Sequence, residues 1–220
     1  MKKTFFIALF YTIFLSATIA QVAPPFWKEI VAFKKIDSAQ SPPVNPILFV
    51  GSSSFTKWTD LSDYFPGYAV VNRGFGGSTL LDLIRYAYDV ILPYQPKQVL
   101  IYCGENDLAY SDSITAADVV KRFKTLFAII RVNLPETIIN YVSIKPSPAR
   151  KNVRNKVIES NKQIKSFMKR QRWSGYIDVY TAMIDPAGNP RTELFLADSL
   201  HMKPEGYAIW GEIIKPFLVR

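Results

Sequence analysis

The sequence predicts a single α/β domain with an open, mainly parallel five-stranded sheet and helices on both of its faces. The length of 220 residues suits one domain with a sizeable core and is short for two. Five apolar segments are continuous rather than alternating, which is typical of parallel strands that are buried on both faces. Helical hydrophobic patterns lie between these segments, as the right-handed crossovers of a parallel sheet require.

The strand candidates are short apolar runs that begin after a turn-rich connector. Residues 21–45 hold a short helix, about Trp27–Lys35, followed by the sequence SAQSPPVNP. The domain itself is therefore expected over residues 46–220. Its strands are predicted at Ile47–Val50, Tyr68–Asn72, Gln98–Cys103, Thr137–Ser143 and Tyr176–Tyr180.

Four apolar stripes at helical spacing are expected to pack against the sheet. Thr115 is the expected N-cap of the second helix, and Pro204 occupies a favoured first position of the last one. The stripes consist of Leu80, Leu81, Ile84, Tyr88 and Ile91; of Val119, Phe123, Leu126, Phe127 and Ile130; of Val157, Ile164, Phe167 and Met168; and of Tyr207, Trp210, Ile213, Ile214 and Phe217. We interpret these residues as core, because none of the stripes has the pattern of a cofactor-binding motif.

The N-terminus has the pattern of a secretory signal peptide. Lys2 and Lys3 precede an uncharged apolar stretch that ends in small residues near Ala20. We therefore expect residues 1–20 to be removed and the protein to be exported, to the periplasm or the medium, without stable membrane insertion afterwards. The alternative is an uncleaved membrane anchor, although the stretch is shorter than the ~20 residues of a comfortable span.

The composition excludes several classes of function. The mature chain would keep 25 basic and 18 acidic residues, a formal net charge of +7, but these basic residues are scattered and form no nucleic-acid motif. Cys103 is the only cysteine, so no internal disulfide forms, and its apolar setting predicts a buried core residue. His201 is the only histidine, so no two-histidine metal site can be built.

Polar residues and glycines follow the first three predicted strands. In a parallel sheet, ligands bind beyond the carboxyl ends of the strands, so chemistry is expected there. The first strand ends in Gly51 and three serines, the second in NRGFGGST, and the third in GENDLAY. Lys145 and Pro146, after the fourth strand, either line the same pocket or belong to a plain loop.

A fourth polar segment, LFLADSLHMKPEGY, contains Asp198 and His201. A serine hydrolase needs an imidazole to accept the hydroxyl proton, and His201 is the one candidate. The spacing of three residues places Asp198 on the same face of a helical turn, where a carboxylate would orient the imidazole. The alternative is a surface histidine on a loop that leads into a helix, with Asp198 as a cap.

The glycine-rich segment and the asparagine after the third strand are candidates for stabilising an oxyanion. GFGGST does not match the phosphate-binding pattern G-x-G-x-x-G, whereas its backbone N–H groups could serve an oxyanion. Asn106 could donate its side-chain amide to the same oxyanion. The alternatives are a tight strand-to-helix turn and a turn asparagine. The nucleophile motif G-x-S-x-G of α/β-hydrolases is absent, because Phe55 follows Ser54.

Taken together, the four segments resemble the sequence blocks of the SGNH (GDSL-type) esterase and lipase family. FVGSSSF resembles the first block, usually written Gly-Asp-Ser, and NRGFGG resembles the second. GEND resembles the third block, Gly-x-Asn-Asp, and DSLH the last, Asp-x-x-His. The resemblance covers about residues 47–206 and identifies residues 46–220 as an SGNH hydrolase domain. It implies a flavodoxin-like three-layer α/β/α sandwich.

The same resemblance implies the roles of five residues. Ser53 aligns with the nucleophile, and Asp198 and His201 would complete a catalytic triad. The backbone N–H groups of Ser53 and Gly77 and the side-chain amide of Asn106 would form the oxyanion hole. Gly76 is an alternative to Gly77 as the donor. No metal and no cofactor is implied.

This chain departs from the family pattern in one position, because Ser52 stands where the family usually has aspartate. The choice among Ser52, Ser53 and Ser54 therefore depends on spacing from Gly51, which favours Ser53. If the strand continued, Ser53 would also point to the face opposite the other two serines.

The predicted function is an exported serine esterase that hydrolyses carboxylic esters of small molecules or glycans through an acyl-enzyme. Short connections without a lid-like apolar insertion favour short acyl groups, such as acetyl esters of carbohydrates. One alternative is a lysophospholipase or lipase-type acylhydrolase. Another is a non-catalytic module that binds a glycan or an anion on the same fold. Acyl transfer to an alcohol would use the same residues as hydrolysis.

Overall fold

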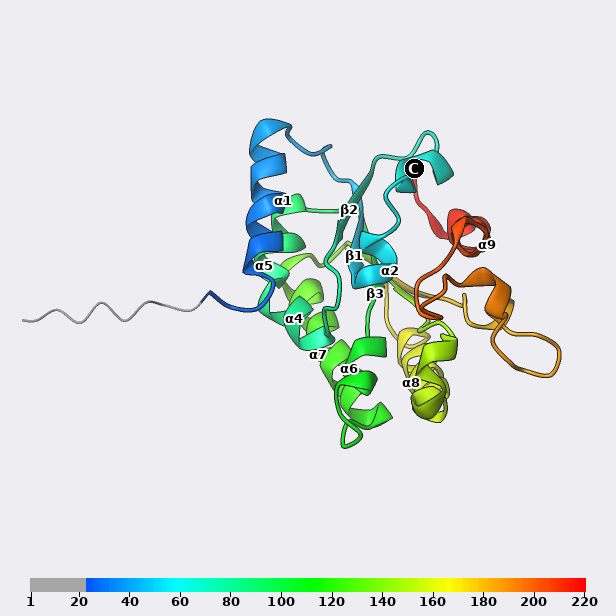
Figure 1. Cartoon of the computed structure of the whole chain (residues 1–220). Helices are drawn as coiled ribbons and strands as arrows, with labels where there is room; N and C mark the ends of the chain where they lie inside the picture. Colours follow the sequence, from blue (N-terminus) through cyan, green and yellow to red (C-terminus); the bar gives the residue numbers. More distant parts are fainter. Residues whose placement is uncertain (1–22) are drawn as a thin grey trace, which may run out of the picture.

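The computed structural model describes residues 23–220, so the expected signal peptide over residues 1–20 lies outside the described residues. The described chain forms a parallel sheet between two layers of helices (Figure 1). The helices are α1 (Trp27–Ala39), α2 (Ser53–Thr56), α3 (Leu61–Tyr64), α4 (Leu80–Arg85), α5 (Ala87–Val90), α6 (Glu105–Tyr110), α7 (Ala116–Asn133), α8 (Arg154–Met168) and α9 (Pro204–Ile214). Short 3₁₀ helices are η1 (Leu92–Tyr94), η2 (Pro148–Val153), η3 (Thr181–Met183), η4 (Thr192–Leu194) and η5 (Lys215–Phe217).

The sheet has five parallel strands in the order β2-β1-β3-β4-β5. Their bounds are β1 (Ile47–Gly51), β2 (Val70–Gly74), β3 (Gln98–Tyr102), β4 (Ile138–Val142) and β5 (Ser174–Ile177). The order 2-1-3-4-5 is that of flavodoxin-like folds, so the predicted fold class is confirmed. The strand order reverses between β1 and β3, and such a switch point opens a crevice at the carboxyl ends of the two strands.

Side chains of the strands alternate between two hydrophobic cores, as the period of two in a strand requires. Leu48 and Val50 of β1 pack with residues of α1, α4, α5, α7 and α8. Ile47 and Phe49 pack on the other face with residues of α2, α3 and α9. Figure 1 shows α1, α4 and α5 on one side of the sheet and α9 on the opposite side. Both faces are therefore covered, which explains why the strands read as continuous apolar runs.

Two of the predicted helix boundaries are confirmed in detail. Thr115 caps α7, and its hydroxyl accepts a hydrogen bond from the backbone N–H of Asp118 at 3.2 Å. Pro204 is the first residue of α9, where its missing N–H leaves no intrahelical bond unmade. The first helix was predicted too short, because α1 continues to Ala39.

The stripe from Leu80 to Ile91 does not form one helix, which corrects the prediction. The helical pattern breaks at Tyr86, which is 3 % exposed and separates α4 from α5. The Tyr86 hydroxyl donates to the carbonyl oxygen of Pro25 at 2.6 Å, so a contact with the distant N-terminal segment fixes the break. Leu81 and Tyr88 are exposed rather than core residues as a consequence.

The ends of three other elements also differ from the prediction. β2 runs two residues further along the chain than expected, because it pairs with β1 as far as Gly74. β5 ends at Ile177, since the next N–H groups, of Val179 and Tyr180, donate to the Ser143 hydroxyl instead of to a strand. Phe217 lies outside α9 and is partly exposed, because Pro216 cannot continue the helix.

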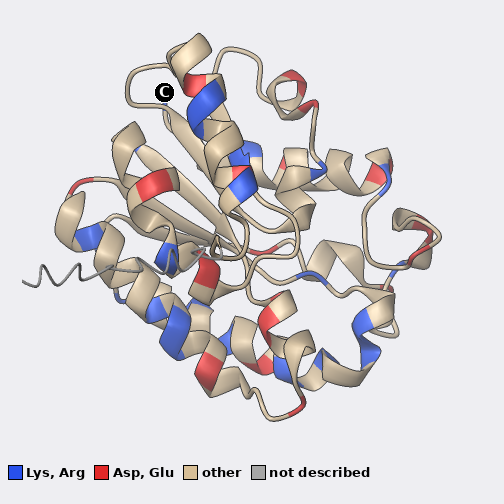
Figure 2. Ribbon diagram, turned by 60° about the vertical axis from the view of Figure 1, so that its left-hand side comes forward, with Lys and Arg blue, Asp and Glu red and all other residues tan. Residues whose placement is uncertain are grey.

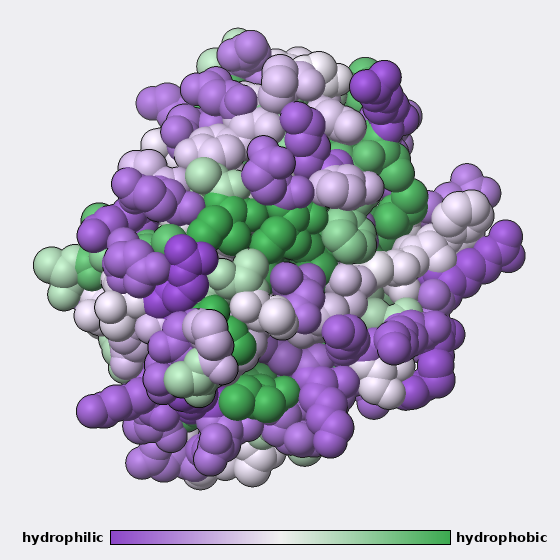
Figure 3. All heavy atoms as spheres, turned by 90° about the vertical axis from the view of Figure 1, so that its right-hand side faces the viewer, coloured by the Kyte–Doolittle hydropathy of each residue, from purple (hydrophilic) through white to green (hydrophobic). Residues whose placement is uncertain are grey.

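The surface of the described chain carries dispersed charge. Figure 2 shows Lys and Arg on several helices rather than on one face. The face on the α9 side of the molecule is mainly hydrophilic, with a central apolar patch (Figure 3). None of the helices in residues 23–220 is both long enough and apolar enough to cross a bilayer.

Candidate active site

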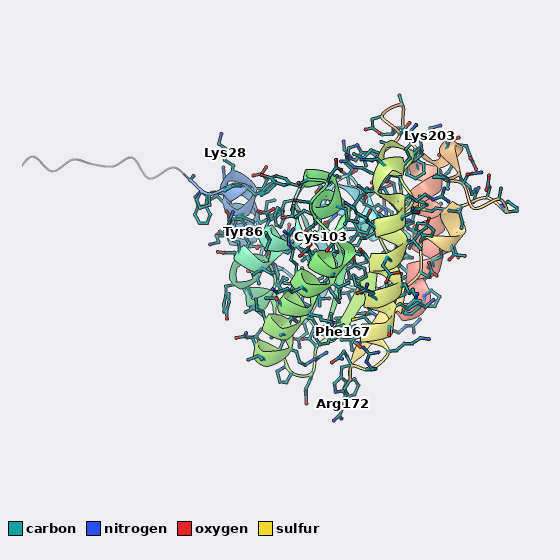
Figure 4. All side chains as sticks on the ribbon, turned by 90° about the horizontal axis from the view of Figure 1, so that it is seen from below. Lys28, Tyr86, Cys103, Phe167, Arg172 and Lys203 are labelled. Carbon is teal, nitrogen blue, oxygen red and sulfur yellow. The ribbon has the colours of Figure 1, made fainter. Side chains whose placement is uncertain are left out.

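The carboxyl ends of β1 and β3 approach one another unusually closely at Gly51. A Cβ atom on this residue would lie 1.9 Å from the carbonyl oxygen of Tyr102, so only glycine fits. The next N–H, that of Ser52, donates to the same carbonyl at 3.1 Å. Figure 4 labels Cys103, which follows β3, near the centre of the molecule. Cys103 is 1 % exposed, as predicted for a core residue.

Ser53 is the first residue of α2 and the most exposed of the three serines. Ser52 is only 3 % exposed and Ser54 only 2 %. The argument from strand alternation does not hold, because the strand ends at Gly51 and a helix begins two residues later. Solvent access nevertheless favours the same serine as the sequence did, since only Ser53 is open to a substrate.

The loop after β2 is fastened to the end of β1. The carbonyl oxygen of Gly51 accepts hydrogen bonds from the N–H of Phe75 at 2.9 Å and from the hydroxyl of Ser78 at 3.2 Å. Gly77 has a φ of 85°, a left-handed conformation that glycine adopts without strain. A Cβ on Gly76 would lie 3.8 Å from the Cβ of Ser53, so the loop passes directly beside the candidate nucleophile.

Backbone donors at this edge are left available. Within residues 23–220, no hydrogen bond takes up the N–H of Ser53, Gly76 or Gly77. Groups of this kind, held by a rigid loop, are suited to stabilise a developing oxyanion. The contacts do not separate Gly76 from Gly77, and the role of Gly77 stays a prediction.

Asn106 reaches the same loop from α6. Its side-chain amide donates one hydrogen to the carbonyl oxygen of Ser78 at 3.0 Å. An asparagine amide carries two hydrogens, so a second one remains for a ligand. The side chain is partly exposed, whereas its neighbours Glu105 and Asp107 are buried. One amide hydrogen of Asn106 is thus held by Ser78, and the other is available to a ligand.

Asp107 has a positioning role that the sequence analysis did not assign. Its carboxylate is fully buried and accepts hydrogen bonds from the N–H of Leu80 at 3.0 Å and from Arg122 at 2.8 Å. Burial raises the pKa of Asp107, and the bonds from Arg122 and Leu80 oppose that shift. Asp107 therefore ties α6 to the start of α4, just after the glycine loop. The only signal for it was its place in the GEND segment.

Asp198 and His201 form a hydrogen-bonded pair in a turn rather than on a helix. Nδ1 of His201 lies 2.6 Å from Oδ2 of Asp198. The other carboxylate oxygen accepts the N–H groups of Leu200 at 3.0 Å and of His201 at 2.9 Å. Ser199 takes a left-handed φ of 56° to close the turn. The predicted juxtaposition exists, although its cause is this turn and not helical spacing.

The electrostatics of the pair follow from these bonds. The hydrogen bond from the His201 side chain, with those from the backbone, holds the pKa of Asp198 well below its usual range. The carboxylate therefore remains charged and fixes which ring nitrogen faces it. With Nδ1 engaged, Nε2 is the nitrogen of His201 that is left for a proton transfer.

The turn is anchored to the rest of the molecule by core packing and by a hydrogen bond. Phe195 and Met202 form a short antiparallel bridge and are buried in the same core as Phe55 of α2. The N–H of Ala149 donates to the carbonyl oxygen of Ser199 at 3.0 Å. No hydrogen bond joins Ser53 to His201 in the described chain, and in unliganded hydrolases such bonds often form only when substrate is bound.

A buried ionic cluster lies next to Asn106. Nζ of Lys145 contacts Oε2 of Glu105 at 2.6 Å and the Tyr102 hydroxyl at 3.2 Å, and this hydroxyl donates to the same carboxylate oxygen at 2.9 Å. Lys145 is only 1 % exposed, so its side chain is a buried ion-pair partner rather than part of a plain loop. This pairing could not be predicted from the sequence, because 40 residues separate the two charges.

The described chain shows no clustering of potential metal ligands. Within residues 23–220, no group of three or more His, Cys, Asp and Glu side chains is arranged to hold a metal ion. The candidate site therefore consists of hydroxyl, amide, imidazole and carboxylate groups, a set that suits acyl transfer through a serine.

Solved structures with the same fold come from several bacteria. A Streptococcus pneumonia protein described provisionally as a platelet activating factor shares 20% identity, with a TM-score of 0.76, over 87% of this chain and 92% of that one. A GDSL-like lipase from Bacteroides thetaiotaomicron shares 19% identity, with a TM-score of 0.74, over 86% and 96%. A catalytic mutant of an acetylxylan esterase from Geobacillus stearothermophilus shares 14% identity, with a TM-score of 0.63, over 79% and 93%.

The sequence itself also matches a family model. A search of curated proteins gave no significant match. The match to the model of the GDSL-like lipase/acylhydrolase family covers residues 46–209, which include the three polar segments at the strand ends and the segment with Asp198 and His201. The chain therefore belongs to the GDSL-like lipase/acylhydrolase family, whose members are esterases and acylhydrolases.

Proposed function

We propose that this protein is an exported serine esterase that cleaves carboxylic esters through an acyl-enzyme on Ser53. The observation that carries the proposal is the hydrogen bond of 2.6 Å between Asp198 and His201. A histidine held in this way has one defined nitrogen available and a charge partner for its protonated form. Neither feature is needed by a surface histidine on a loop.

The first half of the reaction forms a covalent bond between Ser53 and the acyl group. Nε2 of His201 accepts the hydroxyl proton as Oγ of Ser53 attacks the ester carbonyl. The carbonyl oxygen becomes an oxyanion, stabilised by the N–H of Ser53, the N–H of Gly77 and the free amide hydrogen of Asn106. His201 then donates its proton to the leaving alcohol as the ester bond breaks.

The second half of the reaction releases the acid. Water attacks the acyl-enzyme while His201 accepts a proton from it, and the collapse of the second oxyanion returns the proton to Ser53. The carboxylate of Asp198 stays ionised throughout and stabilises the imidazolium. An alcohol in place of water would give acyl transfer, so analysis of products with an added alcohol distinguishes the two reactions.

The substrate proposed is an ester of a short acyl group, such as an acetyl ester of a carbohydrate. Its support is the likeness in fold to a Geobacillus acetylxylan esterase. A lipase-type acylhydrolase would instead prefer long chains. A series of p-nitrophenyl esters from acetate to palmitate tests this choice, with the highest kcat/KM expected for acetate.

Export is part of the proposal and has its own measurement. Removal of residues 1–20 predicts a mature chain that begins at Gln21, and N-terminal sequencing of the protein from the periplasm or medium reads this directly. A chain that retains Met1 in the membrane fraction would contradict cleavage.

The nucleophile is tested by labelling the purified protein with a fluorophosphonate, which reacts with activated serines. A single adduct on Ser53 is expected, and it should disappear in both Ser53→Ala and His201→Ala. Ser52→Ala and Ser54→Ala are matched controls and should still be labelled. An adduct on either neighbouring serine would correct the nucleophile. A folded wild-type protein that takes no label would favour a non-catalytic binding module.

A further inference from the structure

The η2 segment and its neighbours enclose a pocket that the proposed reaction does not use. It is lined by the polar residues Lys145, Ser147, Arg150, Lys151 and Arg154 and by the apolar residues Pro146, Val157 and Pro190, the last from a separate loop. Its cavity volume is about 30 Å³, so it is a small pocket. Four of these eight residues are basic and none is acidic, in contrast to the mixed charge over the rest of the surface (Figure 2).

The positive charge at this pocket is not neutralised by the described chain. Lys145 is paired with Glu105. Arg150, Lys151 and Arg154 have no carboxylate within salt-bridge distance in residues 23–220. Three guanidinium and ammonium groups near one cavity repel each other, so an anion bound among them would lower the electrostatic free energy.

Two donors in the wall are buried and unpaired. The hydroxyl of Ser147, a residue only 4 % exposed, has no hydrogen-bond partner in the described chain. Nε of Arg150 is likewise buried without a partner. Buried polar atoms are nearly always hydrogen-bonded, because a buried donor without a partner loses the hydrogen bonds that water would provide. An arginine and a hydroxyl together are well suited to a planar or tetrahedral oxyanion.

The pocket adjoins the candidate active site on two sides. The N–H of Ala149, within η2, donates to the carbonyl oxygen of Ser199 at 3.0 Å, between Asp198 and His201. Lys145 belongs both to the pocket wall and to the ion pair with Glu105, the residue before Asn106. A group bound here would therefore lie beside the turn that holds Asp198 and His201.

We propose that this pocket is a subsite for an oxyanion (carboxylate, phosphate or sulfate) carried by the ester substrate. The assignment rests on the proposed esterase function and makes the substrate an acidic ester, such as an acetylated acidic sugar. Arg150 and Lys151 bind the anion through charge, and the Ser147 hydroxyl and Arg150 Nε donate hydrogen bonds to it. None of these residues takes part in bond cleavage.

The first test measures binding alone and does not depend on activity. Wild-type protein is titrated with inorganic phosphate, sulfate and glucuronate, each at constant ionic strength, and binding is followed by calorimetry. Saturable binding of at least one anion is expected. The anion that binds most tightly identifies whether the substrate carries a phosphate, a sulfate or a carboxylate. The double variant Arg150→Gln/Lys151→Gln should bind that anion at least tenfold more weakly. The charge-matched control Lys169→Gln/Arg170→Gln, at the end of α8, should bind as the wild type does.

The second test compares two acetyl esters that differ only in charge: O-acetylated methyl glucuronoside and O-acetylated methyl glucoside. The wild type should favour the acidic ester through a lower KM, and this preference should fall at least tenfold in Arg150→Gln/Lys151→Gln. The activity on the neutral ester should stay unchanged, which shows that the variant is folded. Added salt should reduce the preference as well.

The outcomes separate the two proposals. Hydrolysis of both esters with equal KM, or a preference that survives in the double variant, overturns the subsite and leaves the esterase. Saturable anion binding that depends on Arg150 and Lys151, in a protein that hydrolyses neither ester, upholds the pocket and overturns the esterase. Absence of both binding and hydrolysis overturns both.

Discussion

Asn106 illustrates how a single side chain serves structure and chemistry together. One amide hydrogen is bound to the carbonyl oxygen of Ser78, and this bond fixes the direction of the other. A pre-oriented donor is worth more in the transition state than a mobile one, because no reorganisation is needed as charge develops. This residue therefore connects the geometry of the glycine loop to the rate of the reaction.

Replacement of Asn106 by alanine should lower kcat by about 10²–10³-fold with little change in KM, since the donor acts on the oxyanion rather than on the bound ester. Steady-state kinetics on p-nitrophenyl acetate measures both constants. Asn155→Ala, on the exposed face of α8, is the control and should leave both unchanged. A kcat of Asn106→Ala within threefold of the wild type would remove this side chain from the oxyanion hole.

The pH dependence of the reaction should reflect one ionisation on the acid side. The base must be neutral to accept a proton, so kcat/KM falls once His201 is protonated. The ionisation of Asp198 should not steepen the dependence of kcat/KM on pH, because the pKa of Asp198 is held below the usual carboxyl range. As its folded-state pKa is depressed, this carboxylate stabilises the turn above about pH 4, and the contribution is lost only as the pH falls further.

A plot of log(kcat/KM) between about pH 4 and 8 should thus fall toward acidic pH with a limiting slope of one. Two observations would contradict this assignment: a slope of two, or a constant rate from pH 5 to 8. The His201→Ala variant should lose most of the activity, and its remaining activity should no longer fall toward acidic pH.

At the scale of the elements, the decisive contact is the approach of β1 to β3 at Gly51. Alanine there would place a Cβ 1.9 Å from the Tyr102 carbonyl, so the strands must separate. Gly51→Ala should therefore lower the free energy of unfolding by at least about 3 kcal/mol, measured by urea denaturation. Gly67→Ala is the control, because its Cβ meets nothing within 4 Å and only its positive φ costs about 1 kcal/mol. Equal effects of the two substitutions would contradict this account.

Several elements could be predicted from the sequence because their signals are local. β1 and β3 are continuous apolar runs, and the cap at Thr115 lies next to its helix. The single histidine likewise restricted the candidates for the Asp198–His201 pair to one. Local patterns of this kind depend on neighbours within a few residues, which the sequence displays directly.

Other features could not be predicted, because their partners are far along the chain. The break at Tyr86 depends on Pro25, 61 residues away. The buried bonds of Asp107 lead to Leu80 and Arg122, 27 and 15 residues away, and so its positioning role is invisible to any window of sequence. Long-range contacts thus decided both the missed helix break and the missed site residue.

On the scale of the whole molecule, the C-terminal residues close the edge of the sheet opposite the candidate site. Gln98, the first residue of β3, is fully buried. Its amide donates to the carbonyl oxygen of Phe217 at 2.7 Å and to Asn140 at 2.6 Å, and its oxygen accepts the N–H of Val219 at 3.0 Å. One side chain in the central strand therefore holds the end of the chain.

Gln98→Ala should lower the free energy of unfolding by at least about 2 kcal/mol, because it leaves buried polar groups without partners. Urea denaturation measures the change. The kcat on p-nitrophenyl acetate at 25 °C should stay within twofold of the wild type, since the substitution lies at the other edge of the sheet. Gln163→Ala, which removes one contact on the surface of α8, is the comparison and should cost under about 0.5 kcal/mol. A loss of activity without a loss of stability would contradict this separation.

The position of the C-terminus has a practical consequence for attachment of the protein to solid supports. The chain ends beside the amino ends of the strands, whereas Ser53 follows the carboxyl end of β1 (Figure 1). A linker added after Arg220 would therefore tether the molecule with its reactive edge directed away from the support. Beads or sensor chips loaded in this way present every copy in one orientation, with the crevice open to large, slowly diffusing polymers.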